Sequence, residues 1–277
     1  MLRVLIFVLL AAAAAAQQPL TVTFSALDKK GQPVENLRVE DVRIEHDGKL
    51  LAVQELRFDP RQRLDVVVLF DVSHSQRSAL DQIRDAAGEV LRQLQLRRSD
   101  RLSMVVFSDR VHEERAGIDL DAADKMLYSA WPVGTSAIFD SIERTRVHFT
   151  VEPGFRRVVL LLSDGEDSAS QKRSPADVPR SLAEAGAVLF AVDLNPMVLG
   201  GQPKAAQVLD RMAHASGGES CYPRTEGQMK KCAAMVAAAA RATYLATLAA
   251  DRLPAAHKLK IMGPKGVRIL APTRHAD

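Results

Sequence analysis

The chain has 277 residues, a formal net charge of +3 from 37 basic and 34 acidic residues, and a hydrophobic share of 47%. This length suits one large domain, or a medium-sized domain with a small partner, and the hydrophobic share is sufficient for a sizeable core. The near balance of charge, together with the lack of any long basic block, argues against a protein that binds nucleic acid.

The first residues predict a secretory signal peptide over residues 1–16. Arg3 precedes an apolar run and a string of alanines. Ala14 and Ala16 then satisfy the small-residue rule for cleavage before Gln17. The apolar run is shorter than the roughly 20 residues that cross a bilayer comfortably. We therefore expect a secreted or periplasmic protein with no membrane span after cleavage; the alternative is an uncleaved N-terminal anchor.

Residues 17–60 predict an N-terminal β segment. Thr21–Phe24 and Val42–Glu45 alternate between polar and apolar residues, as half-buried strands do. Asp47-Gly48 is a pair typical of a tight hairpin, and residues 51–58 read as the return strand. Because this segment is small for an independent domain, we expect it to pack against another part of the chain.

Residues 61–242 predict an α/β domain. Continuous apolar runs, typical of strands buried on both faces, occur at Val66–Phe70, Met104–Phe107, Val158–Leu162 and Val188–Val192. Apolar residues at helical spacing follow the first run, and residues 174–185 begin with a Ser cap and end before Gly186. Strands that alternate with helices predict a doubly wound, mostly parallel sheet.

The chain beyond the last apolar run predicts two more helices and a second β segment. The helices are expected at about residues 204–215 and 228–241. Residues 243–277 show short strands and a turn at Gly263–Gly266. We expect this C-terminal segment to pair with the N-terminal one in one small sheet, so that both chain ends form a small flanking β subdomain.

Cys221 and Cys232 are the two cysteines of the chain. In an oxidising compartment, two cysteines this close in sequence could form a disulfide. The alternative is two buried free thiols, because the sequence does not fix the Cα separation that pairing demands.

Polar side chains follow the apolar runs at the points where open α/β sheets bind ligands. The expected metal ligands are Asp71, Ser73, Ser75, Thr135 and Asp164. Carboxylates and hydroxyls are hard oxygen donors, which favour Mg²⁺, or Mn²⁺ or Ca²⁺, over zinc. A cation between two close carboxylates offsets their repulsion. The neutral hydroxyls leave the cation able to take one more acidic ligand from outside.

The motifs that carry these ligands resemble, in order and spacing, the metal-ion-dependent adhesion site of von Willebrand factor A domains over about residues 64–195. They are Asp71-Val72-Ser73-His74-Ser75, Gly134-Thr135-Ser136 and Ser163-Asp164-Gly165. The flanking β segments resemble, more loosely, a group of bacterial secreted proteins with such a domain. The resemblance implies that Asp71, Ser73, Ser75 and Thr135 touch the ion directly or through water, and that Asp164 often acts through water.

We place His74, Trp131, Ser136 and Glu166 at a rim that faces the partner. The family commonly has Gly at the position of His74, whose imidazole either leans toward the ion and favours softer metals or is an exposed loop residue. Trp131 precedes Thr135 closely and is either a rim residue or part of the core.

These observations predict a secreted, metal-dependent adhesion or interaction module, and not an enzyme. Its ion would bridge to an acidic group on a protein partner. No Gly flanks Ser73 or Ser75 as a Ser-hydrolase elbow requires, and the sequence has neither a P-loop nor a Gly-rich dinucleotide fingerprint. Haloacid-dehalogenase-like phosphatases need a second acid at the position of Ser73. The alternatives are an unrecognised metal-dependent hydrolase and a scaffold with a vestigial, metal-free site.

Cleavage of the signal peptide predicts a mature chain that begins near Gln17. N-terminal sequencing of the native protein should find this terminus on protein exported from the cytoplasm. A chain that keeps Arg3 and stays in the cytosol would contradict the prediction.

Overall fold

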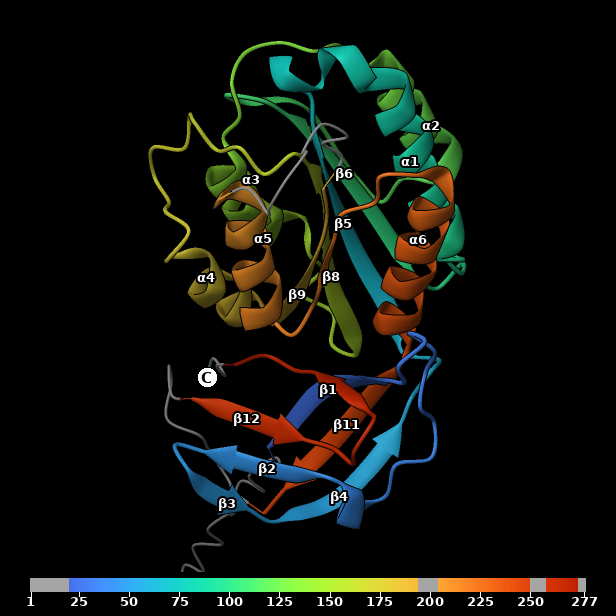
Figure 1. Cartoon of the computed structure of the whole chain (residues 1–277), viewed down its shortest axis with the longest axis vertical. Helices are drawn as coiled ribbons and strands as arrows, with labels where there is room; N and C mark the ends of the chain where they lie inside the picture. Colours follow the sequence, from blue (N-terminus) through green and yellow to red (C-terminus); the bar gives the residue numbers. More distant parts are fainter. Residues whose placement is uncertain (1–19, 194–203, 250–257, 274–277) are drawn as a thin grey trace, which may run out of the picture.

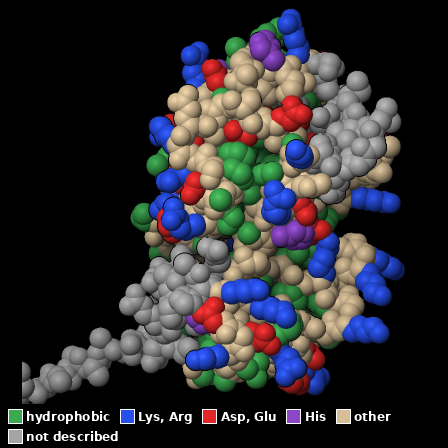
Figure 2. Space-filling model, turned by 60° about the vertical axis from the view of Figure 1, so that its left-hand side comes forward, with side chains coloured by type: hydrophobic (Ala, Val, Ile, Leu, Met, Phe, Trp, Pro, Cys, Tyr) green, Lys and Arg blue, Asp and Glu red, His purple; other side chains and the backbone are tan. Residues whose placement is uncertain are grey.

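The computed structural model describes residues 20–193, 204–249 and 258–273. The predicted signal peptide and its cleavage point lie outside the described residues. An α/β unit stands above a smaller β unit (Figure 1). On the face in Figure 2, acidic and basic side chains are interspersed over the α/β unit. No helix in the described part of the chain is both long and apolar enough to cross a membrane.

A six-stranded sheet forms the centre of the α/β unit, in the order β10-β9-β8-β5-β6-β7. Its strands are β5 (Arg63–Asp71), β6 (Arg101–Phe107), β7 (Val111–Ala116), β8 (Phe155–Ser163), β9 (Ala187–Asp193) and β10 (Ser220–Cys221). Neighbouring strands run parallel, except that β7 is antiparallel to β6. The predicted doubly wound, mostly parallel sheet is confirmed, and the apolar runs form its four central strands.

Both faces of this sheet are buried, because alternate side chains of each central strand enter different cores. Val66 and Val68 pack in a cluster with α1, α2 and α6, whereas Val67 and Leu69 pack on the opposite face with α3, α4 and α5 (Figure 1). The helices are α1 (Leu80–Gln93), α2 (Leu120–Ser129), α3 (Ile138–Arg144), α4 (Val178–Ala185), α5 (Lys204–Ala215) and α6 (Glu226–Arg241), with short 3-10 helices η1 (Val39–Asp41), η2 (His74–Ala79) and η3 (Thr145–His148). A continuous apolar run is what a strand between two helical layers requires.

Helix α4 begins later than the sequence predicted. Asp177 accepts hydrogen bonds from the backbone N–H and the hydroxyl of Ser174, at 3.0 and 2.7 Å. These bonds hold residues 174–177 in a turn, so the helix starts at Val178. Its end is at the predicted place, because Gly186 takes the left-handed conformation that ends a helix, with φ at 61°.

Strands from both ends of the chain form the β unit. One sheet has the order β13-β1-β11-β4 and a second has the order β12-β2-β3, all antiparallel. The strands are β1 (Thr21–Leu27), β2 (Arg43–His46), β3 (Lys49–Leu51), β4 (Val53–Phe58), β11 (Thr243–Leu248), β12 (Leu259–Met262) and β13 (Arg268–Leu270). Phe24 and Tyr244 stack in the shared core, with ring centroids 5.3 Å apart.

The pairing of β1 and β4 with β11 confirms that the two chain ends meet. We expected one sheet, but the structure has two. The hairpin of β2 and β3, turned by Asp47 and Gly48 at positive φ, pairs with β12 and closes the apolar core as a second layer. The domain limits proposed after residues 60 and 242 stay predictions.

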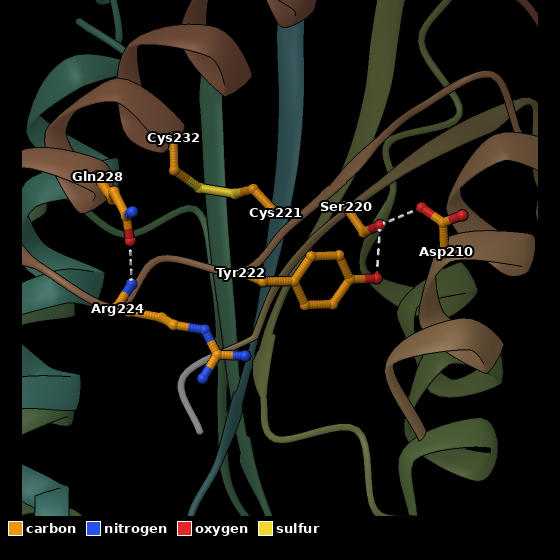
Figure 3. The surroundings of a disulfide bond; sticks show 7 residues. All are labelled: Asp210, Ser220, Cys221, Tyr222, Arg224, Gln228 and Cys232. Carbon is orange, nitrogen blue, oxygen red and sulfur yellow. Dashed lines mark hydrogen bonds between the residues drawn. A yellow bond between two sulfur atoms is a disulfide. The ribbon is translucent and has the colours of Figure 1, made fainter. Parts of the chain in front are cut away.

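A disulfide joins Cys221 in the edge strand β10 to Cys232 in α6, with Cα atoms 6.0 Å apart (Figure 3). The sequence had left this pairing open. The hydroxyl of Ser220 donates to a carboxylate oxygen of Asp210 in α5 at 2.6 Å and lies 2.9 Å from the hydroxyl of Tyr222. The short strand β10 is therefore linked to both helical layers.

Removal of the disulfide should destabilise the fold. The crosslink restricts a short loop of the unfolded chain, which typically contributes about 2–4 kcal/mol. We expect the double variant Cys221→Ser/Cys232→Ser to lose roughly that much free energy of unfolding in urea denaturation. Wild-type protein in excess reductant should match the variant. Equal midpoints for oxidised wild type and the variant would show that the crosslink adds no stability.

Candidate metal centre

Two of the proposed ligands meet at one edge of the central sheet. β5 ends at Asp71, and its parallel neighbour β8 ends at Ser163. Phe70 lies opposite Leu162 in the register of the two strands. Asp164, which follows β8 directly, therefore stands next to the end of β5. This is the edge at which open α/β sheets bind ligands.

Two backbone hydrogen bonds join the loop after β5 to the loop before α3. The N–H of Val133 donates to the carbonyl of Val72 at 2.8 Å, and the N–H of His74 donates to the carbonyl of Gly134 at 3.0 Å. Glycine is required at position 134, because its φ is +69° and an added Cβ would lie 2.8 Å from a carboxylate oxygen of Asp109. The two loops are thus held together at a fixed distance.

Asp71 is fully buried, and three donors hold its carboxylate. Its Oδ1 accepts the backbone N–H of Ser73 at 2.9 Å. Its Oδ2 accepts the hydroxyls of Ser136 at 2.8 Å and Ser163 at 2.6 Å. Ser163 is itself oriented, since its oxygen accepts the backbone N–H of Gly165 at 3.0 Å. The orientation of the Asp71 carboxylate is therefore set by its neighbours.

Ser136 does not occupy the exposed rim that we expected for it. It is only 2% exposed, because its carbonyl accepts the N–H groups of Ser168 and Ala169, both at 2.9 Å, and the loop after β8 covers it. It supports Asp71 instead. Sequence reasoning also missed the role of Ser163, although one signal was available: it is the last residue of a buried strand that the fold places beside Asp71.

The hydroxyl ligands proposed from the sequence lie on the two loops. The Oγ atoms of Ser73 and Ser75 are 3.0 Å apart, so these two hydroxyls converge. Ser73 is buried, whereas Ser75 and Thr135 are exposed. Ser73 takes an extended conformation immediately before η2, the 3-10 helix that contains Ser75.

The carboxylates of Asp71 and Asp164 are both buried, and neither has a cationic partner among the residues that the structure describes. Oδ1 of Asp164 accepts the backbone N–H of Glu166 at 3.1 Å. Burial raises the pKa of Asp71, hydrogen bonds from Ser163 and Ser73 oppose that rise, and the negative charge of Asp164 adds to it. None of the ion pairs between described residues involves either aspartate.

A cavity of about 550 Å³ opens over these loops. Among its lining residues are Ser73, His74, Ser75, Thr135, Ser136, Gly165 and Glu166. His74 and Glu166 are exposed at its mouth. Asp71 and Asp164 are buried and are not among the lining residues. Trp131 is 69% exposed and does not line the cavity, so it is not a core residue.

The donor set fits a hard divalent cation. The described residues contain no group of three or more His, Cys, Asp or Glu side chains that could hold a metal ion. The candidate centre instead combines two carboxylates with neutral hydroxyls. Such an all-oxygen set of low charge suits Mg²⁺, Mn²⁺ or Ca²⁺ better than zinc.

Known proteins of similar structure share this fold. A von Willebrand factor type A protein from Catenulispora acidiphila matches at 13% identity with a TM-score of 0.51, covering 95% of this chain and 75% of that one. Proximal thread matrix protein 1 from the mussel byssus, with a zinc-occupied MIDAS motif, matches at 16% identity with a TM-score of 0.52, covering 76% of this chain and 50% of that one.

Sequence comparison identifies the family. No curated protein matches the chain. The family model of the von Willebrand factor type A domain matches residues 65–231, which include every proposed metal ligand. Because this match spans more than half of the sequence, the chain belongs to the von Willebrand factor type A (VWA) domain family.

Proposed function

We propose that this chain is a secreted VWA interaction module that binds a divalent cation and bridges through it to an acidic group of a protein partner. The buried pair Asp71 and Asp164 supports this most directly. Burial of an unpaired charge is costly, and here two carboxylates lie at neighbouring strand ends without a described Lys or Arg as ion-pair partner. A cation between them would offset both costs.

The proposed ion lies in the cavity over the two loops. Its ligands would be Asp71, Ser73, Ser75 and Thr135, directly or through water, and Asp164 through water. The hydroxyls line the cavity and the carboxylates lie behind them, which suits an ion that keeps part of its water shell. Mg²⁺ usually keeps several waters in protein sites, and it is our first choice, with Mn²⁺ and Ca²⁺ as alternatives.

The proposed partner is a protein with an exposed acidic residue. Hydroxyl ligands do not neutralise a divalent cation, so the bound ion would attract a carboxylate from outside. His74 and Glu166 at the cavity mouth would then face the partner. Trp131 and Val133 are exposed on the loop that leads to Thr135, where they offer apolar contact area.

A secreted or periplasmic location is part of the proposal. The signal-peptide pattern at the N-terminus predicts export. The disulfide between Cys221 and Cys232 supports it, because disulfides persist in oxidising compartments.

We propose no catalytic role for the chain. The Oγ of Ser108 lies 2.6 Å from Nε2 of His112, a contact of the kind that activates a nucleophile. Ser108 is fully buried, so its hydroxyl does not meet a substrate. The vestigial, metal-free scaffold is the alternative that a metal titration separates from our proposal.

Isothermal titration calorimetry with Mg²⁺, Mn²⁺ and Ca²⁺ should show one-site binding that Asp71→Ala abolishes. Ser73→Ala, Ser75→Ala and Thr135→Ala should weaken binding less, because water can replace a neutral ligand. Asp121→Ala, at an exposed position in the first turn of α2, is the matched control and should bind as wild type does.

The remaining outcomes separate the alternatives. Equal heats for wild type and Asp71→Ala would place the ion elsewhere. No binding, even with acetate present to supply a partner's carboxylate, would favour the vestigial scaffold. Ser163→Ala removes only a support of Asp71 and should cost about 10–100-fold in metal affinity. Capture of partners from the native envelope with Mg²⁺, and release by chelator, tests the bridge, with Asp71→Ala as the control bait.

Without metal, Asp71→Asn should be more stable than wild type at neutral pH. Burial raises the pKa of Asp71, so the stability linked to this group is present below its unfolded-state pKa and is lost as pH rises through the folded-state pKa. Asn does not ionise and avoids this loss. Thermal unfolding in chelator between about pH 4 and about pH 8 should show midpoints that converge in acid. A variant that is less stable at every pH would contradict this.

A further inference from the structure

Arg156 lies at the junction of the α/β unit and the β unit and is only 4% exposed. It stands near the start of β8, where its Nη1 donates to the hydroxyl of Thr243 in β11 at 2.6 Å. Its Nη2 donates to the hydroxyl of Ser25 in β1 at 2.7 Å. Its Nε has no hydrogen-bond partner in the structure as described. No ion pair between described residues includes it.

A buried guanidinium without a carboxylate partner is unfavourable. Burial lowers the pKa of Arg156 to about 10, which still leaves the group charged at neutral pH. The two hydroxyls that accept from it are neutral. The hydroxyl of Ser25 also donates its own proton to the carbonyl of Ala239 at 2.8 Å. The positive charge is therefore oriented by its neighbours but not compensated by them.

A cavity of about 220 Å³ borders this group, and its lining includes Arg156, Thr21 and Thr23. Alternate residues of a strand share one face. Phe24 fills the core of the β unit, so Thr21 and Thr23 share with Ser25 the face that meets the α/β unit. Figure 1 shows β1 beneath the lower ends of β8 and β9. Hydroxyl groups of the β unit and the guanidinium of the α/β unit thus border the same cavity.

We propose that this junction cavity binds a small oxyanion, a carboxylate or phosphate group, between Arg156 and the hydroxyls of Thr21 and Thr23. The planar fork of a guanidinium matches the geometry of both groups. The cavity volume is several times the roughly 30 Å³ that a water molecule occupies in the liquid, so it has room for an ion of this size. The site is separate from the candidate metal centre and does not depend on the proposed function.

The carboxyl end of α4 also borders the cavity, at Ala183 and Gly186. A helix carboxyl end carries about half a negative charge, which favours Arg156 and opposes an anion. This end already has other partners, since the N–H of Gly186 bonds the carbonyl of Ala183 and Nη1 of Arg157 donates to the carbonyl of Ala185 at 2.7 Å. It therefore does not supply the full counter-charge that Arg156 lacks.

Calorimetric titration of the full chain with inorganic phosphate and, separately, with acetate tests the proposal. The Asp71→Ala background, buffer freed of metal ions by a chelating resin, and constant ionic strength keep the candidate metal centre from contributing. We expect one-site binding of at least one anion. Binding of phosphate alone identifies a phosphate group as the ligand, and binding of acetate alone identifies a carboxylate.

Three variants locate the binding. Arg156→Met removes the charge at similar length and should weaken the affinity by at least about tenfold, because hydrogen bonds to charged groups are the strong ones. Thr23→Val keeps the shape of the side chain and should weaken the affinity for the anion several-fold. If Arg156→Met does not fold, this variant alone tests the proposal. Arg115→Met, at an exposed arginine of β7, is the matched control and should change nothing. No binding of either anion, or an affinity that Arg156→Met and Thr23→Val leave unchanged, overturns the proposal.

Discussion

The central strands β5 and β8 are buried on both faces, and this constraint decides where the chain carries its polar groups. Within β5, the residues from Val66 to Phe70 enter the two cores alternately, so no polar side chain fits between them. Charged groups therefore stand at the strand ends. Because β5 and β8 run parallel in close register, Asp71 and Asp164 meet at one edge and Arg156 lies at the other.

The sequence predicted the central strands and the meeting of Asp71 with Asp164 because both depend on short-range patterns. An apolar run identifies a strand that is covered on both faces, and residues that follow two parallel strands must share an edge. The edge strands β7 and β10 were missed because neither contains an apolar run. β7 is largely polar and β10 has two residues, so neighbours, rather than a pattern of their own, hold them in the sheet.

Other features depend on contacts between distant parts of the chain. Ser136 is 65 positions from Asp71, which it supports, and no local pattern marks it as buried. Arg156 reaches Thr243 and Ser25 across 87 and 131 positions, so only the meeting of the two chain ends in one β unit buries it. Pairing of the cysteines required a Cα separation that sequence does not contain.

Asp71 and Arg156 are buried charges of opposite sign at opposite ends of the sheet, and hydroxyls hold both of them. At the carboxyl edge, serine hydroxyls donate to Asp71, and at the amino edge hydroxyls of the β unit accept from Arg156. Hydroxyls orient a charge without neutralising it. Helices that connect parallel strands, such as α3 and α4, begin at the first edge and end at the second, so each helix end brings about half a charge of the sign that helps. Helix α2 follows the antiparallel strand β7 and runs the other way. This partial compensation lowers the free-energy cost of burying each charge. Each charge still lacks a full counter-charge among the described residues. The proposed reversible binding of a cation at one edge and of an anion at the other would make use of both conditions.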